Sequence, residues 1–231
     1  MKTLAITTST NRCAVALLLG AEPVAARIVD EDRLHAERIF ALIDDALLEA
    51  AWTKEELGLV ACDLGPGSFT GVRVGLATAK GIALGLGIPI VGVGSLEAMA
   101  AAVIHGTLGA PVLAVIDARR GERFVAAYAV DGVRMAPRHV ANADLASLAA
   151  ELGDGWRWCG DASGLLDDAN GLLAPACRLP DPCWVGKVGA ALVLSRGPDE
   201  LAALEPVYVR GPDASLPATP PDWRVQRPMS R

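Results

Sequence analysis

Short apolar runs and helix-period segments alternate along this chain, and that alternation indicates a fold of the α/β type. The runs at residues 3–8, 13–19 and 24–29 have the length of strands, and turn-forming residues separate the second from the third. From residue 36 the apolar side chains instead recur every three or four positions, which is the period of an amphipathic helix. We therefore expect an antiparallel meander of three strands followed by a helix over about 34–51.

The alternation continues and then begins again in the second half of the chain. Further strands are predicted at 59–64, 89–93, 112–117, 123–130 and 157–159. Further helices are predicted at 68–86, 95–104, 142–152 and 185–195. Since each half opens with adjacent strands and continues with helices, we expect two similar lobes, residues 1–106 and 107–210. Residues 211–231 hold five prolines and no periodic run, which predicts an extended or disordered tail.

Size and charge narrow the range of functions. A chain of 231 residues buries a large core without help from disulfides or metals. Its net charge of -6 argues against a protein whose main task is to grip nucleic acid by itself, although a local arginine patch is compatible with this balance. The sequence has no uncharged apolar run of membrane-spanning length and no signal peptide, so we expect a cytoplasmic protein without membrane contact.

The cysteines and histidines do not predict a metal or redox site. The five cysteines are scattered, no C-x-x-C occurs, and no histidine stands at ligand spacing from them. Reduced thiols in a reducing compartment are the expected state.

The glycine-rich segment 65–87 carries the most information. Its turn offers backbone N–H groups to an anion, but no lysine follows Gly71 as the phosphate-binding P-loop requires, and the glycine spacing does not fit a dinucleotide fingerprint. Within the helix, Gly71, Gly75 and Ala79 are spaced by four and form a strip where another backbone can approach closely. The sequence leaves open whether this strip packs on the protein's own sheet. The alternative is that one of the two helices, at 34–51 or 68–86, lies at an interface with another chain.

Several segments resemble the TsaB (YeaZ) family, in order and over most of the chain. They are LAITTST…CAVAL at the start, GPGSFTGVRVGLATAKGIA at 65–83, PIVGVGSLEAMA at 89–100, AVIDARRGERFVAAY at 114–128 and EPVYVR at 205–210. This family is the small, non-catalytic subunit of the bacterial machinery that places threonylcarbamoyl on adenosine beside the tRNA anticodon. The resemblance implies two ASKHA-type (actin-like) α/β lobes, each a mixed sheet that opens with an antiparallel meander and is flanked by helices.

The resemblance also implies a set of partners. A member of this family pairs with TsaD, its larger catalytic paralogue, through the first-lobe helices at about 34–51 and 68–87, and the ATPase TsaE joins the assembly. ATP is then used by the complex, no cofactor is assigned to this chain, and tRNA is met indirectly. Exposed apolar helices are also compatible with a homodimer of the isolated chain.

The residues predicted to contact the partner lie on these two helices. They are His35, Ile39, Ile43, Leu47, Val72, Arg73, Leu76 and Ala79. The sequence does not tell which of them point toward the sheet. We expect a charge on the outward face, such as Val72→Glu, to abolish pairing without unfolding the chain.

No catalytic residue is predicted. Thr7 stands where members of the family often have Asp at the end of the first strand, so a charged partner for a metal is missing. Asp117 ends a strand in the second half, but two arginines follow it, and we interpret it as a turn former and partner of an arginine. Four positions after His35 stands Ile39 rather than the second histidine that a metal site on this helix would need. Two alternatives to a scaffold stay open, namely a free-standing ATP-dependent ASKHA-type enzyme and, less favoured, a glycoprotease-like peptidase.

Overall fold

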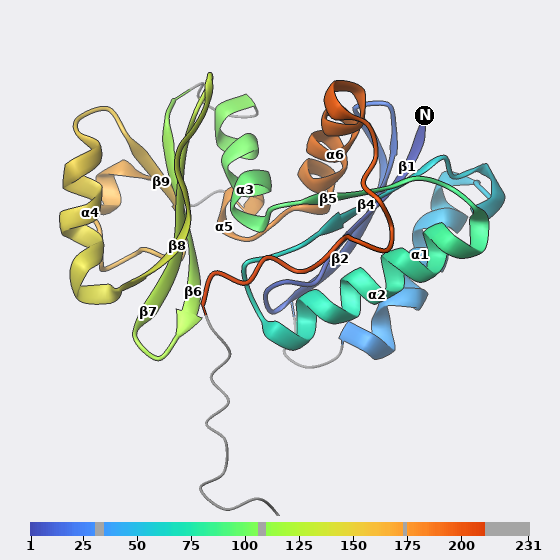
Figure 1. The fold of residues 1–231 in the computed structure, drawn as a ribbon, viewed down its shortest axis with the longest axis horizontal. Helices are drawn as coiled ribbons and strands as arrows, with labels where there is room; N and C mark the ends of the chain where they lie inside the picture. The colour runs from blue at the N-terminus through green and yellow to red at the C-terminus, as the bar shows by residue number, and fades with distance from the viewer. Residues whose placement is uncertain (31–34, 106–109, 173–174, 211–231) are drawn as a thin grey trace, which may run out of the picture.

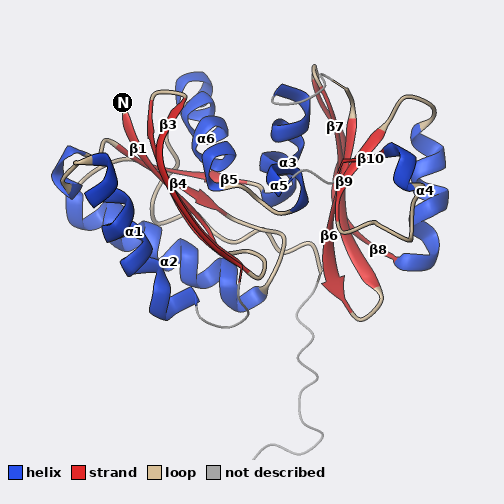
Figure 2. Ribbon diagram, turned by 180° about the vertical axis from the view of Figure 1, so that it is seen from behind, coloured by secondary structure: helices blue, strands red, loops and turns tan. Residues whose placement is uncertain are grey.

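Two five-stranded sheets stand side by side in this computed structural model, which describes residues 1–30, 35–105, 110–172 and 175–210. Helices cover both faces of each sheet (Figures 1 and 2). The two-lobed, actin-like α/β fold expected from the sequence is confirmed. The predicted tail at 211–231 lies outside the described residues.

The first sheet has the strand order β3-β2-β1-β4-β5. Its strands are β1 (Lys2–Thr7), β2 (Arg12–Leu19), β3 (Glu22–Asp30), β4 (Leu59–Asp63) and β5 (Ile90–Val93). The first three form the predicted antiparallel meander, and β4 and β5 add to β1 in parallel. Helices α1 (His35–Ala50) and α2 (Phe69–Leu86) cover one face of this sheet.

The second sheet repeats this plan in the order β10-β9-β6-β7-β8. Its strands are β6 (Val112–Arg119), β7 (Glu122–Ala129), β8 (Gly132–Ala141), β9 (Arg157–Gly160) and β10 (Gly171–Leu172). Strands β6, β7 and β8 are antiparallel, and β9 and β10 continue in parallel. Helix α4 (Leu145–Leu152) covers the outer face, and the short α5 (Pro175–Arg178) contacts the inner one.

Two helices cross between the halves of the sequence. Helix α3 (Ser95–Val103) comes from the first half, yet Met99 packs with Val112 of the second sheet. Helix α6 (Pro182–Arg196) comes from the second half and packs Val185 against Leu18 of the first sheet. The division at residue 106 stays a prediction, and the packing of these helices runs across it.

Residues 199–210, the crossing segment, tie the lobes together. The segment starts beside β5, where Asp199 N–H donates to Ile90 O at 2.9 Å. It passes the end of β4, where Val207 N–H donates to Leu64 O at 2.8 Å. It reaches the second sheet at Arg210, whose Nη1 donates to Glu122 Oε2 at 2.7 Å. In Figure 1 it is the orange-red trace that leaves α6 and ends beside β6.

Candidate functional site

A buried carboxylate marks the point where the ends of β1 and β4 meet. Asp63 is 1% exposed and accepts hydrogen bonds from Thr7 Oγ1 at 2.6 Å, Ser9 Oγ at 2.5 Å and Ser95 Oγ at 2.5 Å. Gly65 N–H donates at 2.9 Å to Oδ1, the oxygen that Ser95 also contacts, whereas Thr7 and Ser9 contact Oδ2. A carboxylate has about four acceptor positions. The four donors therefore satisfy Asp63 from within the chain.

The glycine-rich turn before α2 also makes its contacts and hydrogen bonds within the chain. A Cβ at Gly67 would lie 1.9 Å from Ser9 O, and one at Gly71 would lie 2.1 Å from Thr8 O. The first turn of α2 therefore needs glycine because it lies directly on the turn after β1. Ser68 N–H donates to Ser9 O, and the Ser68 side chain accepts from Gly71 N–H as the N-cap. These amide hydrogens bind the chain's own oxygens, which argues against a phosphate-binding role for this turn.

The outward sides of α1 and α2 expose several apolar residues, which on α1 stand among charged ones. We call this surface the outer helix face and define it by Phe40, Leu48, Ala77, Gly81 and Leu84. Phe40 is 57%, Leu48 81% and Leu84 71% exposed. Among the described residues, nothing lies within 4 Å of a Cβ built at Gly81. This part of the helix therefore has no intramolecular reason for glycine.

An arginine that stacks on one aromatic ring and hydrogen-bonds the hydroxyl of a second borders the outer helix face. The Arg73 guanidinium lies 3.7 Å from the centre of the Phe69 ring, and its Nε donates to Tyr208 Oη at 2.8 Å. The two rings are 5.6 Å apart, and each residue is about half exposed. The crossing segment therefore supplies a residue to the rim of this surface.

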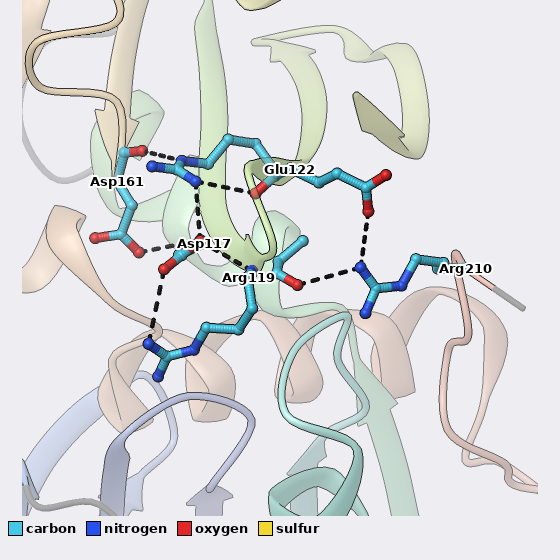
Figure 3. A network of polar contacts seen from close by, with 7 residues as sticks. Asp117, Arg119, Glu122, Asp161 and Arg210 are labelled. Atoms are coloured by element: carbon cyan, nitrogen blue, oxygen red, sulfur yellow. Dashed lines mark hydrogen bonds and ion pairs between the residues drawn. The ribbon is translucent and has the colours of Figure 1, made fainter. Parts of the chain in front are cut away.

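The hairpin between β6 and β7 carries a second polar network (Figure 3). Asp117 accepts from Arg123 Nη1 and from Arg119 N–H, each at 2.9 Å. Asp161 in turn accepts from Asp117 N–H at 3.2 Å and, through its carbonyl, from Arg123 Nε at 2.8 Å. The interpretation of Asp117 as a turn former and arginine partner is confirmed.

Two further findings concern the described part of the chain. It contains no group of three or more His, Cys, Asp and Glu residues that could hold a metal ion, and its five cysteines form no disulfide. None of its helices has both the length and the apolar character needed to cross a membrane.

Comparison with known proteins gives the family. Residues 26–160 match the family model described as TsaD, tRNA N6-adenosine threonylcarbamoyltransferase. The chain is 33% identical to the "tRNA threonylcarbamoyladenosine biosynthesis protein TsaB" of Escherichia coli, over 91% of this chain and 95% of that protein. The chain belongs to the TsaB family. It is also 29% identical to TsaB of Haemophilus influenzae, over 90% of this chain and 92% of that protein.

A solved structure supports the assignment to the TsaB family. YeaZ from Pseudomonas aeruginosa superposes with a TM-score of 0.75 at 27% identity, over 90% of this chain and 99% of that one. The likeness covers both lobes, so the resemblance stated from the sequence motifs is confirmed.

Most of the residues predicted to bind a partner are instead part of the first-lobe core. Those at most 6% exposed are Ile39, Ile43, Leu47, Val72, Leu76 and Ala79. They point inward because the sheet lies directly under both helices. The expectation that Val72→Glu leaves the fold intact is wrong, since the new charge would be buried. Arg73 is exposed, and the side chain of His35 lies outside the described residues. A partner interface on these TsaB-family helices stays a prediction.

Sequence reasoning missed the residues that do line this surface. Phe40, Leu48 and Leu84 fall within the predicted helices, but the broad apolar arc of each helix concealed which side faces outward. Tyr208 lies in the EPVYVR segment that resembles the TsaB family, so that motif was a usable signal. Its contact with Arg73 spans 135 residues of sequence and has no local pattern.

Proposed function

We propose that this chain is a non-catalytic scaffold subunit of the complex that forms threonylcarbamoyladenosine in tRNA. Its relatives in Escherichia coli and Haemophilus influenzae are each named as a tRNA threonylcarbamoyladenosine biosynthesis protein, and these names support a role in that pathway. In this proposal the chain pairs with the catalytic paralogue TsaD through the outer helix face, and the ATPase TsaE joins through the complex. ATP is consumed by the complex and not by this chain.

The observation that carries the proposal is the contrast between the two halves of α2. Gly71 and Gly75 are explained by close contact with Thr8, whereas Gly81 and Gly85 face open space among the described residues. A glycine inside a helix costs about 1 kcal/mol relative to alanine. Two exposed glycines beside Ala77 form a smooth surface on which the helix of a second chain can lie closely. Helices packed in this way from two chains form a four-helix bundle.

The saturated carboxylate supports the non-catalytic part of the proposal. Thr7 occupies the end of β1, and its hydroxyl is bound to Asp63 rather than facing an open site. Because Asp63 already accepts four hydrogen bonds, a metal–phosphate group would have to displace several of them.

The proposal is tested with a charge on the outer helix face. We expect Leu84→Glu and Phe40→Glu each to weaken association with TsaD at least about 100-fold, since a buried unpaired charge costs several kcal/mol at an interface. Both positions are solvent-exposed in the isolated chain, so its melting temperature should hardly change. The measurement is calorimetric titration of each variant with TsaD.

The matched control is Leu194→Glu, a residue 87% exposed on α6, which covers the opposite face of the same sheet. This variant should bind TsaD like the wild type. Unchanged affinity for both outer-face variants would contradict the proposed interface. Titration of ATP into the chain alone tests the alternative of a free-standing ATP-dependent enzyme. ATP binding with turnover would favour that alternative over the scaffold.

A further inference from the structure

Arg73 is held in one position on the exposed side of α2 by two aromatic residues. Its Cζ lies 3.7 Å from the centre of the Phe69 ring and 5.8 Å from the centre of the Tyr208 ring. Its Nε donates to Tyr208 Oη at 2.8 Å. An arginine on a helix surface ordinarily keeps much of its rotamer freedom, and a ligand must then pay the entropy of ordering it. Here the chain itself orders the side chain, because Phe69 supports the guanidinium plane and Tyr208 fixes its Nε edge.

The charge of Arg73 is not matched within the described part of the chain. Its two terminal nitrogens make no hydrogen bond there, and no carboxylate forms an ion pair with it. Arg73 is exposed, and α2 contains no Asp or Glu. The terminal nitrogens of a guanidinium form a planar fork that fits the two oxygens of a carboxylate or phosphate. Arg73 therefore presents an ordered anion-binding fork to solvent.

Arg73 also lies in line with the outer helix face. One row of exposed residues runs along α2 at intervals of four, namely Phe69, Arg73, Ala77 and Gly81. Residues at this spacing are neighbours on a helix surface. A helix of a second chain that lies on the smooth part of this row therefore reaches Arg73 as it continues toward the start of α2.

The surroundings of Arg73 favour a protein carboxylate over a nucleic-acid phosphate. The exposed neighbours Phe69, Tyr208 and Val207 are apolar or aromatic, at 52%, 50% and 38% exposure. On the adjacent α1, the exposed charged residues are mostly acidic: Glu37, Arg38, Asp44, Asp45 and Glu49. A nucleic-acid backbone carries a charge at every nucleotide and would be repelled by this acidic helix. A protein helix can bring one carboxylate to Arg73 and apolar side chains to the rest of the surface.

We propose that Arg73 binds a carboxylate on a helix of TsaD and so fixes the register in which that helix lies along α2. The strip at Ala77 and Gly81 is smooth and by itself allows the partner to slide, whereas one charged pair at its end specifies a single alignment. Tyr208 is a positioning residue that acts through Arg73. The inference rests on the proposed function, and it adds the chemistry by which the partner is aligned.

The first test is calorimetric titration of Arg73 variants with TsaD, at salt concentrations between about 50 and 300 mM. Arg73→Gln removes the charge, and Arg73→Lys keeps the charge but removes the planar fork. The matched control is Arg134→Gln, which removes an exposed arginine from β8 of the second sheet. Thermal denaturation verifies that each variant is folded at the temperature of the titration.

We expect Arg73→Gln to weaken TsaD binding at least about 10-fold at low salt, and the deficit to shrink as salt screens the wild-type pair. Arg73→Lys should bind about 5-fold more weakly than the wild type and keep its salt dependence, because the charge remains without the bidentate geometry. Arg134→Gln should behave like the wild type. Unchanged affinity of Arg73→Gln, or an equal loss in the control, would overturn the inference.

The role of Tyr208 is tested by a double-mutant cycle. Tyr208→Phe removes the hydroxyl acceptor and keeps the ring, so it should weaken TsaD binding about 3-fold in the wild-type background. It should have no effect in the Arg73→Gln background, because its contribution passes through Arg73. The same loss in both backgrounds would overturn the positioning role.

Exchange of charges tests for the carboxylate on the partner. Arg73→Glu should abolish pairing, since it places two carboxylates together. Asp→Arg and Glu→Arg substitutions along the helices of TsaD are then tried one at a time, and one of them should restore pairing with Arg73→Glu. Failure of every exchange would overturn the carboxylate. Weaker binding of an unmodified tRNA transcript by the Arg73→Gln complex, with unchanged TsaD affinity, would assign Arg73 to RNA phosphate instead.

The Leu84→Glu variant keeps this inference apart from the proposed function. If Leu84→Glu loses TsaD and Arg73→Gln does not, the interface stands and the role of Arg73 is refuted alone. If the wild-type chain does not bind TsaD, the proposed function itself is refuted.

Discussion

At the scale of single residues, Asp63 is a buried carboxylate whose hydrogen bonds are all made within the chain. Its carboxylate is buried beneath three hydroxyl groups that come from Thr7, Ser9 and Ser95. Ser95 belongs to α3, which packs on the second sheet, whereas Asp63 ends a strand of the first. The hydrogen bonds of this cluster therefore link the two lobes. They also occupy the carboxylate oxygens that a ligand would need as free acceptors.

Removing this carboxylate should destabilise the protein strongly. Asp63→Ala leaves three buried hydroxyls and one amide without their acceptor, and hydrogen bonds to a charged group contribute about 1.5–3 kcal/mol each, so a loss of at least about 3 kcal/mol is expected. Urea denaturation of the purified chain measures the free energy of unfolding.

Thr3 provides the control for that experiment. Its hydroxyl is buried and has no hydrogen-bond partner among the described residues. Thr3→Val removes an unsatisfied polar atom and should leave stability unchanged or raise it by about 1 kcal/mol. A loss for Asp63→Ala no larger than the effect of Thr3→Val would show that the Asp63 cluster contributes nothing to folding.

At the scale of elements, α2 has two faces that should respond oppositely to the same substitution. Gly75→Ala places a Cβ 2.2 Å from Thr8 Oγ1, and this overlap should cost about 1–3 kcal/mol. Gly81→Ala meets nothing within 4 Å among the described residues and should gain about 0.5–1 kcal/mol from helix propensity. Thermal denaturation of both variants checks the opposite signs, and a destabilising Gly81→Ala would contradict the assigned outer helix face.

The elements also show what the sequence could and could not predict. Strands such as β1 and β4 were predictable because they are short apolar runs bounded by turns. Strand β8 was missed because it is an edge strand with Pro137 and two arginines, so it lacks a clean alternation. The small-residue strip of Gly71, Gly75 and Ala79 was recognised, but that it faces the chain's own Thr8 rather than another chain depends on a contact far away in sequence. Contacts of that range leave no periodic signal.

At the scale of the whole molecule, the contact between the lobes partly buries an ionisable group. Glu97 on α3 lies near Tyr128 of the second sheet and Arg196 of α6. Burial raises its pKa above the ordinary value of 4.5, while the Gly94 N–H and Arg196 partly oppose the shift. The folded chain therefore binds this proton more tightly than the unfolded chain does.

The raised pKa of Glu97 has a definite sign in stability. Stability should fall as the pH rises from about 4.5 through the folded-state pKa, because the unfolded chain releases the proton first. Glu97→Gln keeps an oxygen for the Gly94 N–H and removes the charge, so it should flatten this part of the profile. Urea denaturation across pH 4–8 tests this, and a variant that loses stability as steeply as the wild type would assign the slope to another group.

The crossing of α6 onto the first sheet also has a consequence for the growing polypeptide. The strands of that sheet are complete by residue 93, yet one face receives its cover only from residues 182–196. Until this helix leaves the ribosome, the apolar side chains of Leu18, Val91 and Val93 lack the cover that α6 gives them. A product that stops early therefore displays an open apolar sheet face, the kind of surface by which chaperones and proteases recognise unfinished chains.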